Sequence, residues 1–233
     1  MSIYDSHSEE IERLNALLHS EDDRVARMAA VEEAIRIAES IVEQHPNDAG
    51  AHYILGLAWY NYPGSSSHRS WRCRRALERA VEIDPSSQFA RHYLACLAFD
   101  QERFHDALEI AEGSDFSYFI DLDQEWRALK SEEMKLVYKL RVSPDDFPQS
   151  DFDLFTQRFE DAKQREEKDF TLGSWVPPQE LREHAEWMLD TGVPLEDPRV
   201  VKLVEFISRI GYAHAFWDSR LKQPGEEQSG GAE

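Results

Sequence analysis

The stretch AHYILGLAWYNYPGSSSHRSWRCRRALERAVEIDP, residues 51–85, decides the fold of this chain. It holds two segments whose apolar residues recur at helical spacing, separated by the turn-forming run Pro63 to Ser67. The first segment carries Gly56 and Trp59, whereas the second is rich in arginine and ends at Pro85. Because the residue before a proline avoids the helical conformation, Pro85 marks the end of the second helix. The stretch therefore predicts a helical hairpin.

The same pattern returns further along the chain. The run HPNDAGAHYILGLAWY, residues 45–60, is similar to DPSSQFARHYLACLAFD, residues 84–100, and their prolines lie 39 residues apart. At this period Leu55 corresponds to Leu94 and Gly56 to Ala95. Small residues at such positions allow two helices to approach closely. A single hairpin cannot bury its apolar stripe alone, so the repeat predicts hairpins that stack on their neighbours.

This pattern resembles the tetratricopeptide family of helix–turn–helix repeats, whose period is about 34 residues. The residues that carry the resemblance are Leu55, Gly56, Trp59, Cys73, Leu77, Ala80 and Pro85, with Ala34, Ala38, Pro46, Leu94, Ala95, Ala98, Ala107 and Ala111 in the neighbouring units. The longer period is explained by the Pro63–Ser67 loop. His52 and Arg91 depart from the family's bulky opening residue, and no proline follows Ala111. The resemblance covers residues 8–113 and implies helical hairpins without specifying one function.

We therefore expect an all-α fold in three parts. Residues 1–113 should form a short, right-handed, tetratricopeptide-like solenoid of about three hairpins. Residues 114–221 should add about four helices, over 121–141, 151–167, 178–189 and from 197 onward, that pack on one end or on the inner face of the repeats. Residues 222–233 are rich in Gly, Glu and Ser and are expected to be a disordered tail.

The composition narrows the class of protein. The net charge is −20, which repels nucleic acid and anionic membranes and attracts basic partners. The start of the chain is acidic and does not resemble a signal peptide, and no apolar run approaches the length of a membrane span. The two cysteines, Cys73 and Cys96, have no CxxC neighbour and are expected to be reduced core thiols. A cytoplasmic location follows as the simplest expectation.

The first helix of each repeat is expected to supply an inner face that binds a partner. In the resembled family this face often binds a peptide, and members that grip acidic tails use Lys, Arg and Asn there. Here the predicted face is aromatic and uncharged, which suits an amphipathic helix or an extended apolar segment. Its residues are Tyr53, Leu57, Tyr60, Asn61, Phe89, His92, Tyr93 and Phe99, together with Cys96. The alternative is that the chain's own C-terminal helices fill this groove.

Two charged clusters are candidates for steering a partner. Arg72, Arg75 and Arg79 lie at i, i+3 and i+7 of one helix and should point outward. They either pair with the protein's own acids or form a basic island that orients a partner. The second cluster is acidic, at the loop around Pro144–Pro148, and could dock a basic protein or simply favour helix starts and solubility. It consists of Asp145, Asp146, Asp151 and Asp153.

Motifs for catalysis are absent from the sequence: there is no HExxH, GxSxG, phosphate loop or GxGxxG. His184 shares a helix with Glu180 and Glu183, but their spacing does not define a metal site. We expect no cofactor, no metal, and a non-enzymatic protein-binding adaptor or chaperone-like protein whose partner is a protein or peptide, possibly basic. Two alternatives remain: an acidic immunity or inhibitor protein that neutralises a basic toxin or nuclease, and an enzyme whose site is assembled from distant residues.

Overall fold

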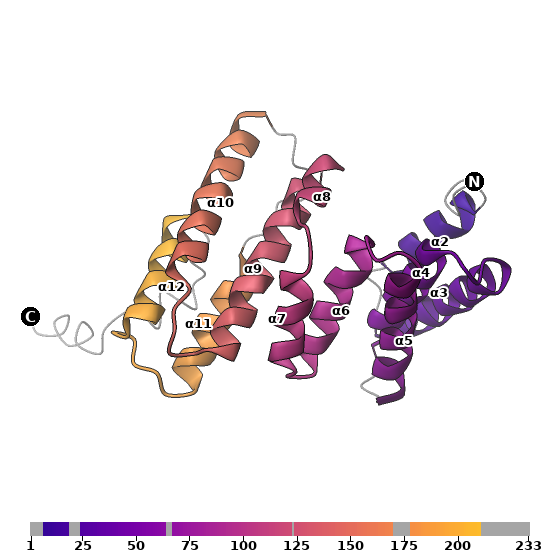
Figure 1. Cartoon of the computed structure of the whole chain (residues 1–233), viewed down its shortest axis with the longest axis horizontal. Coiled ribbons are helices and arrows are strands. Elements are labelled where there is room, and N and C mark those ends of the chain that lie inside the picture. Colours follow the sequence, from indigo (N-terminus) through magenta and orange to yellow (C-terminus); the bar gives the residue numbers. More distant parts are fainter. Residues whose placement is uncertain (1–6, 19–23, 64–66, 123, 170–177, 211–233) are drawn as a thin grey trace, which may run out of the picture. The chain divides into compact units, whose positions relative to one another are not determined.

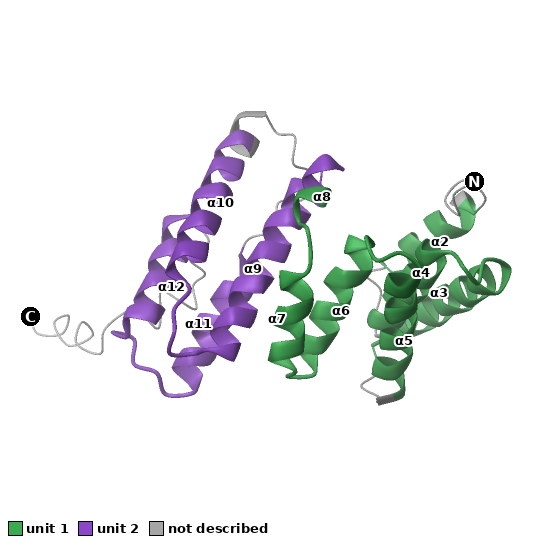
Figure 2. Ribbon diagram, viewed as in Figure 1, with its two compact units in different colours: residues 1–118 green, residues 119–233 purple. Residues whose placement is uncertain are grey.

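A computed structural model describes residues 7–18, 24–63, 67–122, 124–169 and 178–210 (Figure 1). About 80% of these residues lie in eleven helices, and no strand occurs among them. The predicted all-α fold is confirmed. The chain divides into two compact units, residues 1–118 and residues 119–233, so that the first unit ends at Tyr118 rather than at residue 113 (Figure 2).

The first unit consists of three helical hairpins in succession. In each hairpin a helix packs on the next one, and α3 and α5 also pack on the helices that follow them. The two first helices α4 and α6 touch each other as well. The helices are α2 (Ser8–Leu18), α3 (Arg24–Gln44), α4 (Ala49–Tyr60), α5 (Ser67–Ile83), α6 (Gln88–Asp100) and α7 (Phe104–Glu112).

Local sequence fixes the ends of these helices. The helix α3 ends at Gln44, before His45-Pro46, and α5 ends at Ile83, before Asp84-Pro85, as the proline rule predicts. Asp48 caps α4, because its carboxylate accepts the backbone N–H of Ala51 at 3.0 Å. The helix α5 begins at Ser67, the last residue of the predicted turn, so it includes His68 and Arg69.

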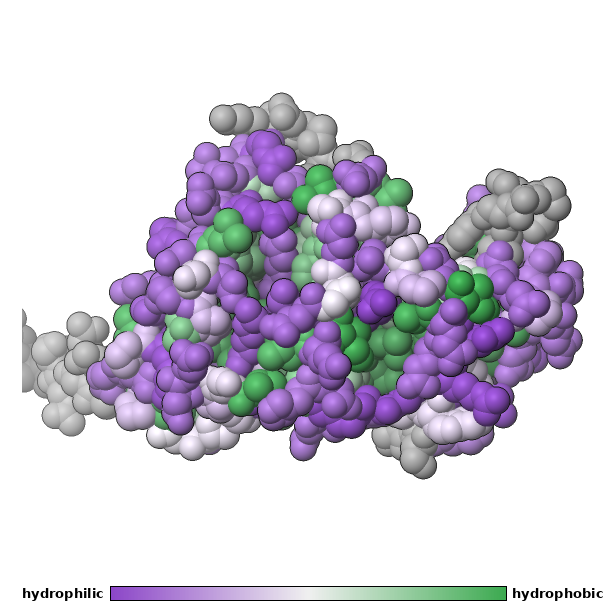
Figure 3. Space-filling view, in the orientation of Figure 1, coloured by the Kyte–Doolittle hydropathy of each residue, from purple (hydrophilic) through white to green (hydrophobic). Residues whose placement is uncertain are grey.

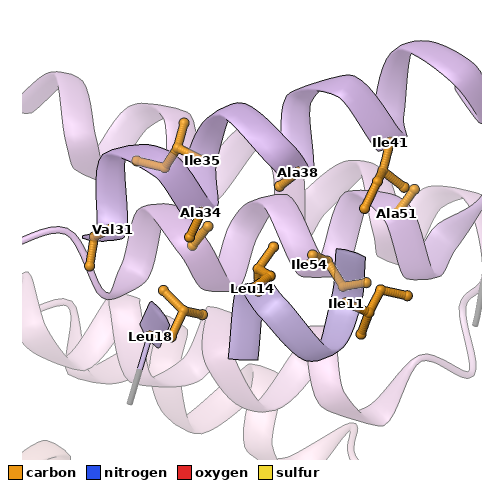
Figure 4. Close-up of a cluster of buried hydrophobic side chains, with 11 residues drawn as sticks. Ile11, Leu14, Leu18, Val31, Ala34, Ile35, Ala38, Ile41, Ala51 and Ile54 are labelled. Carbon is orange, nitrogen blue, oxygen red and sulfur yellow. The ribbon is translucent and has the colours of Figure 1, made fainter. Parts of the chain in front are cut away.

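The core of the first two hairpins is built from small and branched apolar residues. Leu14, Val31, Ala34, Ala38 and Ala58 have no exposed surface. Figure 4 shows how side chains from α2, α3 and α4 converge in this cluster. The predicted small residues of the repeat are therefore buried where helices meet.

A very close approach in this unit joins α4 to α5 at Gly56. A methyl group on Gly56 would lie 2.5 Å from Leu77 Cδ2, so only glycine fits. Beside it, the thiol of Cys73 donates a hydrogen bond to the Gly56 carbonyl oxygen at 3.3 Å. Burial raises the pKa of Cys73 to about 12, which keeps this group a neutral thiol. Both cysteines are buried thiols that form no disulfide bond, as expected.

The second unit packs α9 against α10 and α11, and α11 against α12. Phe206 of α12 has its ring centroid 5.7–6.0 Å from those of Phe152, Phe155 and Phe159 in α10, which forms an aromatic core. These helices are α9 (Glu125–Val142), α10 (Gln149–Asp169), α11 (Gln179–Asp190) and α12 (Pro198–Arg209).

A buried glutamate ties two of these helices together. Glu133 of α9 is 2% exposed, and its carboxylate accepts the backbone N–H of Leu181, in the first turn of α11, at 2.9 Å. Its other oxygen lies 3.0 Å from Lys130 Nζ. Burial raises the pKa of Glu133 to about 7.

Two sequence expectations need correction, and others concern residues that the structure does not describe. A short helix, α8 (Ser117–Asp121), was not expected. The next helix, α9, begins at Glu125 rather than at Asp121, because a turn separates it from α8. In this turn the backbone N–H of Gln124 donates to the Phe119 carbonyl oxygen at 2.8 Å. The predicted last helix ends at Arg209 among the described residues. Its expected continuation over 211–221, and the predicted tail 222–233, lie outside the described residues.

Candidate functional site

The predicted inner face brings together aromatic side chains from α4 and α6. Tyr53 lies 5.5 Å from Phe89 and 6.1 Å from Tyr93, measured between ring centroids. Tyr60 lies 5.2 Å from Tyr93 in an edge-to-face arrangement. Such geometry adds stability beyond simple burial and holds the rings rigidly. All four rings stay partly exposed, and Figure 3 shows apolar surface gathered around α4 and α6 in polar surroundings.

Tyr60 is the most constrained of these rings. Burial raises its pKa, and the carboxylate of Asp100, to which it hydrogen-bonds, raises it further. The hydroxyl therefore remains a neutral donor. Tyr60 therefore holds the face in place through its hydrogen bond to Asp100 and does not ionise.

The other predicted inner-face residues have different surroundings. Leu57 packs on the core of the first two hairpins, and Asn61 donates its amide to the Leu57 carbonyl at 3.0 Å. His92 contacts the ring of Tyr93 and lies 3.7 Å from the sulfur of Cys96. Phe99 packs on Phe104 of α7. The structure thus brings His92 to the aromatic cluster, whereas Leu57 packs on the core and Asn61 caps the C-terminal end of α4.

The aromatic cluster has a member that the sequence reasoning missed. Tyr118 of α8 lies 6.0 Å from Phe89 and is 38% exposed. No repeat pattern extends to α8, so periodicity gave no signal for this residue. We call Tyr53, Tyr60, Phe89, Tyr93 and Tyr118 the aromatic face.

The predicted arginines line a pocket on another side of the first unit. Its volume is about 560 Å³, within the usual range for ligand pockets. Residues of α4 and α5 line it, chiefly Leu55, Trp59, Trp71, Arg72, Arg75 and Arg79. We call this the Arg–Trp pocket. On α4, Trp59 is one residue from Tyr60, or about 100° around the helix, so the pocket and the aromatic face lie on different sides of α4.

Two arginines of the pocket stack on tryptophan rings. The guanidinium of Arg72 lies 5.3 Å from the Trp59 centroid, and that of Arg75 lies 5.4 Å from the Trp71 centroid. Arg72 also pairs with Glu39 of α3 at 3.3 Å. The tryptophans were not predicted as site residues, because their meeting with the arginines depends on how α4 and α5 pack.

The acidic steering residues are mostly paired within the second unit. Asp145 lies 3.4 Å from Arg199, and Asp151 lies 2.5 Å from Lys139. Asp153 accepts the side-chain amide of Gln149 at 2.7 Å. Asp146 is exposed, and its backbone N–H bonds to the Ser143 carbonyl. The four carboxylates therefore belong to one loop region, but two of them are partly neutralised by the protein's own cations.

The described histidines do not belong to a metal-binding cluster. Among the described residues, no group of three or more His, Cys, Asp or Glu side chains could hold a metal ion. Glu180 pairs with Lys130, and Glu183 accepts the amide of Gln179, so neither turns toward His184. Burial lowers the pKa of His184 to about 3, aided by the charges of Arg141 and Arg199. This histidine is a neutral core residue.

No protein-family model, curated protein or solved structure matches the chain. Among the described residues, no helix is both long and apolar enough to cross a membrane. The class that the fold and surfaces define is an all-α protein whose first unit consists of helical hairpins with a partly exposed aromatic face.

Proposed function

We propose that this chain is a non-enzymatic, tetratricopeptide-like binding protein that captures a segment of a partner protein on the aromatic face. The observation that carries the proposal is the series of aromatic ring contacts between the first helices of two successive hairpins, α4 and α6. Tyrosine and phenylalanine are effective anchors because they bury much apolar area with few rotatable bonds. None of the five residues of the face is basic, which favours an apolar helix or extended segment over an acidic tail.

The location that fits this proposal is the cytoplasm. Cys73 and Cys96 are buried thiols that are not joined in a disulfide bond, which is typical of a reducing compartment.

The test is capture of the partner by the tagged full chain from its source cells, with washes at low and then high salt. The best variant is Phe89→Ser with Tyr118→Ser, because these two rings contact each other and Tyr118 is 38% exposed. Tyr60 is unsuited, since its bond to Asp100 also supports the fold. The control is Met28→Ser, which replaces an apolar side chain that is 39% exposed on α3, a helix of the same unit that supplies no residue of this face. Far-UV circular dichroism checks that all variants keep their helices.

The proposal predicts a partner that survives the high-salt wash on the wild-type and Met28→Ser chains and is lost from the double variant. A basic partner that leaves in high salt, and that both variants retain, would instead support the acidic inhibitor. The net charge of −20 and the fully exposed carboxylate of Asp145 favour that second candidate.

A further inference from the structure

The Arg–Trp pocket has walls suited to a ligand that is both apolar and anionic. Leu55, Trp59 and Ala76 supply apolar surface, and Trp71 is 53% exposed beside them. Trp59 also lines a second depression of about 390 Å³, on the side of Ile35 and Tyr62. The two depressions share the Trp59 ring, so an extended chain could place side chains on both sides of it.

Arg75 differs from the other two arginines of the pocket. Arg72 pairs with Glu39, and Arg79 pairs with Glu82 at 3.1 Å. Arg75 is exposed and lies over Trp71, and within the described part of the chain it has neither an ion pair nor a hydrogen bond from its side chain. A stacked guanidinium keeps its N–H edges available, and those edges match a carboxylate in two-pronged geometry.

The pocket carries a small excess of positive charge in a chain whose net charge is −20. Arg72, Arg75 and Arg79 line it together with two glutamates, Glu78 and Glu82. Over its whole length α5 holds five arginines and two glutamates. An acidic ligand is therefore repelled by most of the protein and attracted to this helix, which gives it one favoured place to bind. The same net charge disfavours nucleic acid, whose phosphates extend far beyond one helix.

We propose that the Arg–Trp pocket binds an acidic peptide segment of a partner protein. A carboxylate of the segment takes the N–H edge of Arg75, and a neighbouring aromatic or aliphatic side chain enters the pocket beside Trp59. The site is separate from the aromatic face, so it stands whether or not that face binds a partner.

The experiment starts with selection of phage-displayed random dodecapeptides on the full chain, with counter-selection on the Arg75→Glu variant. The proposal predicts selected peptides in which Asp or Glu flanks an aromatic or aliphatic residue. Peptides that are basic or uncharged, or a selection that yields no peptide dependent on Arg75, would overturn it.

The strongest selected peptide, labelled with fluorescein, is then measured by fluorescence anisotropy against matched variants. Arg75→Ala and Trp71→Ala should each weaken binding by about tenfold or more, as expected for loss of a charge-assisted hydrogen bond or an aromatic anchor. The control is Arg74→Ala, which removes the same charge one residue away. It is suitable because Arg74 does not line the pocket and its guanidinium donates to Gln101 instead. It should change the affinity by less than about threefold, since a charge outside the pocket contributes little.

An equal loss in Arg74→Ala and Arg75→Ala would mean that only the overall charge of α5 matters, which would refute a defined site. Displacement of the peptide by a single-stranded dT12 oligonucleotide would assign the pocket to nucleic acid instead. Variants of the aromatic face, such as Phe89→Ser with Tyr118→Ser, should leave peptide affinity unchanged. Failure of partner capture therefore tests the aromatic face, and failure of peptide binding in Arg75→Ala tests the Arg–Trp pocket, so the two proposals can fail independently.

Discussion

The contact between Gly56 and Leu77 allows a quantitative test of how the central hairpin is packed. In Gly56→Ala the new methyl group would lie 2.5 Å from Leu77 Cδ2 and 2.6 Å from Leu77 Cγ. Leu77 has no exposed surface, so it has no free space into which to turn. Overpacking of this kind costs about 1–3 kcal/mol, whereas alanine in place of a mid-helix glycine gains about 1 kcal/mol. We expect Gly56→Ala to lower the free energy of unfolding of the first unit by about 1 kcal/mol, in the range of about 0–2 kcal/mol that the two terms leave.

A double-mutant cycle separates the clash from other effects of the substitution. Leu77→Ala alone should cost about 2–5 kcal/mol, because it leaves a cavity. In that background the added methyl group has room, so Gly56→Ala should be neutral or stabilising by up to about 1 kcal/mol. The sign of the Gly56→Ala effect should therefore change when Leu77 is replaced.

Urea denaturation followed by far-UV circular dichroism measures these free energies, with separate transitions fitted where the two units unfold independently. Gly113→Ala is the control, because the nearest atom to its added methyl group is 3.6 Å away and its φ is −80°. It should stay within about 0.5 kcal/mol of wild type. An equal cost of Gly56→Ala in the wild-type and Leu77→Ala backgrounds would refute the clash.

Three further predictions concern the second unit. Glu133→Ala should cost about 1–3 kcal/mol in urea denaturation, because it leaves the buried Leu181 N–H without its acceptor, while Lys130 keeps its ion pair with Glu180. The pKa of Glu133 rises on folding from 4.5 to about 7, so the stability of the wild type should fall as the pH rises from 4.5 to 7. Thermal melts should show this fall in melting temperature for the wild type and not for Glu133→Gln. The pKa of His184 falls on folding from 6.5 to about 3, so the stability that the neutral His184 contributes should be lost as the pH drops below 6.5. This loss of stability at low pH should be absent from thermal melts of His184→Leu. Phe206→Ala should cost about 3–5 kcal/mol in urea denaturation, whereas Leu154→Ala, at a residue 59% exposed, should change stability by less than about 0.5 kcal/mol.

The helices of the first unit could be predicted because their signals are local. The prolines at 46 and 85 end two helices in the structure, and apolar spacing correctly placed Ala34 and Ala38 in the core. The short helix α8 was missed because five residues are too few to show a period. Its Tyr118, which extends the aromatic face, was missed with it.

Contacts between distant residues set the limit of the sequence reasoning. The stacking of Arg72 on Trp59 depends on the packing of α4 against α5, which the sequence pattern does not specify. The cap that Glu133 provides to α11 joins residues 48 positions apart. Asp145 is exposed as expected, yet its pairing with Arg199 links residues 54 positions apart and could not be inferred from a local acidic cluster.

The central claim, that the aromatic face binds a partner protein, is tested most directly by site-specific photocrosslinking in the source cells. The photoreactive residue p-benzoylphenylalanine replaces Phe89 on the aromatic face in one chain and Leu154, an exposed apolar residue of α10, in another. Binding at the face predicts a discrete covalent adduct to one protein from position 89 and none from position 154. No adduct at position 89, or the same adduct from both positions, would contradict the claim.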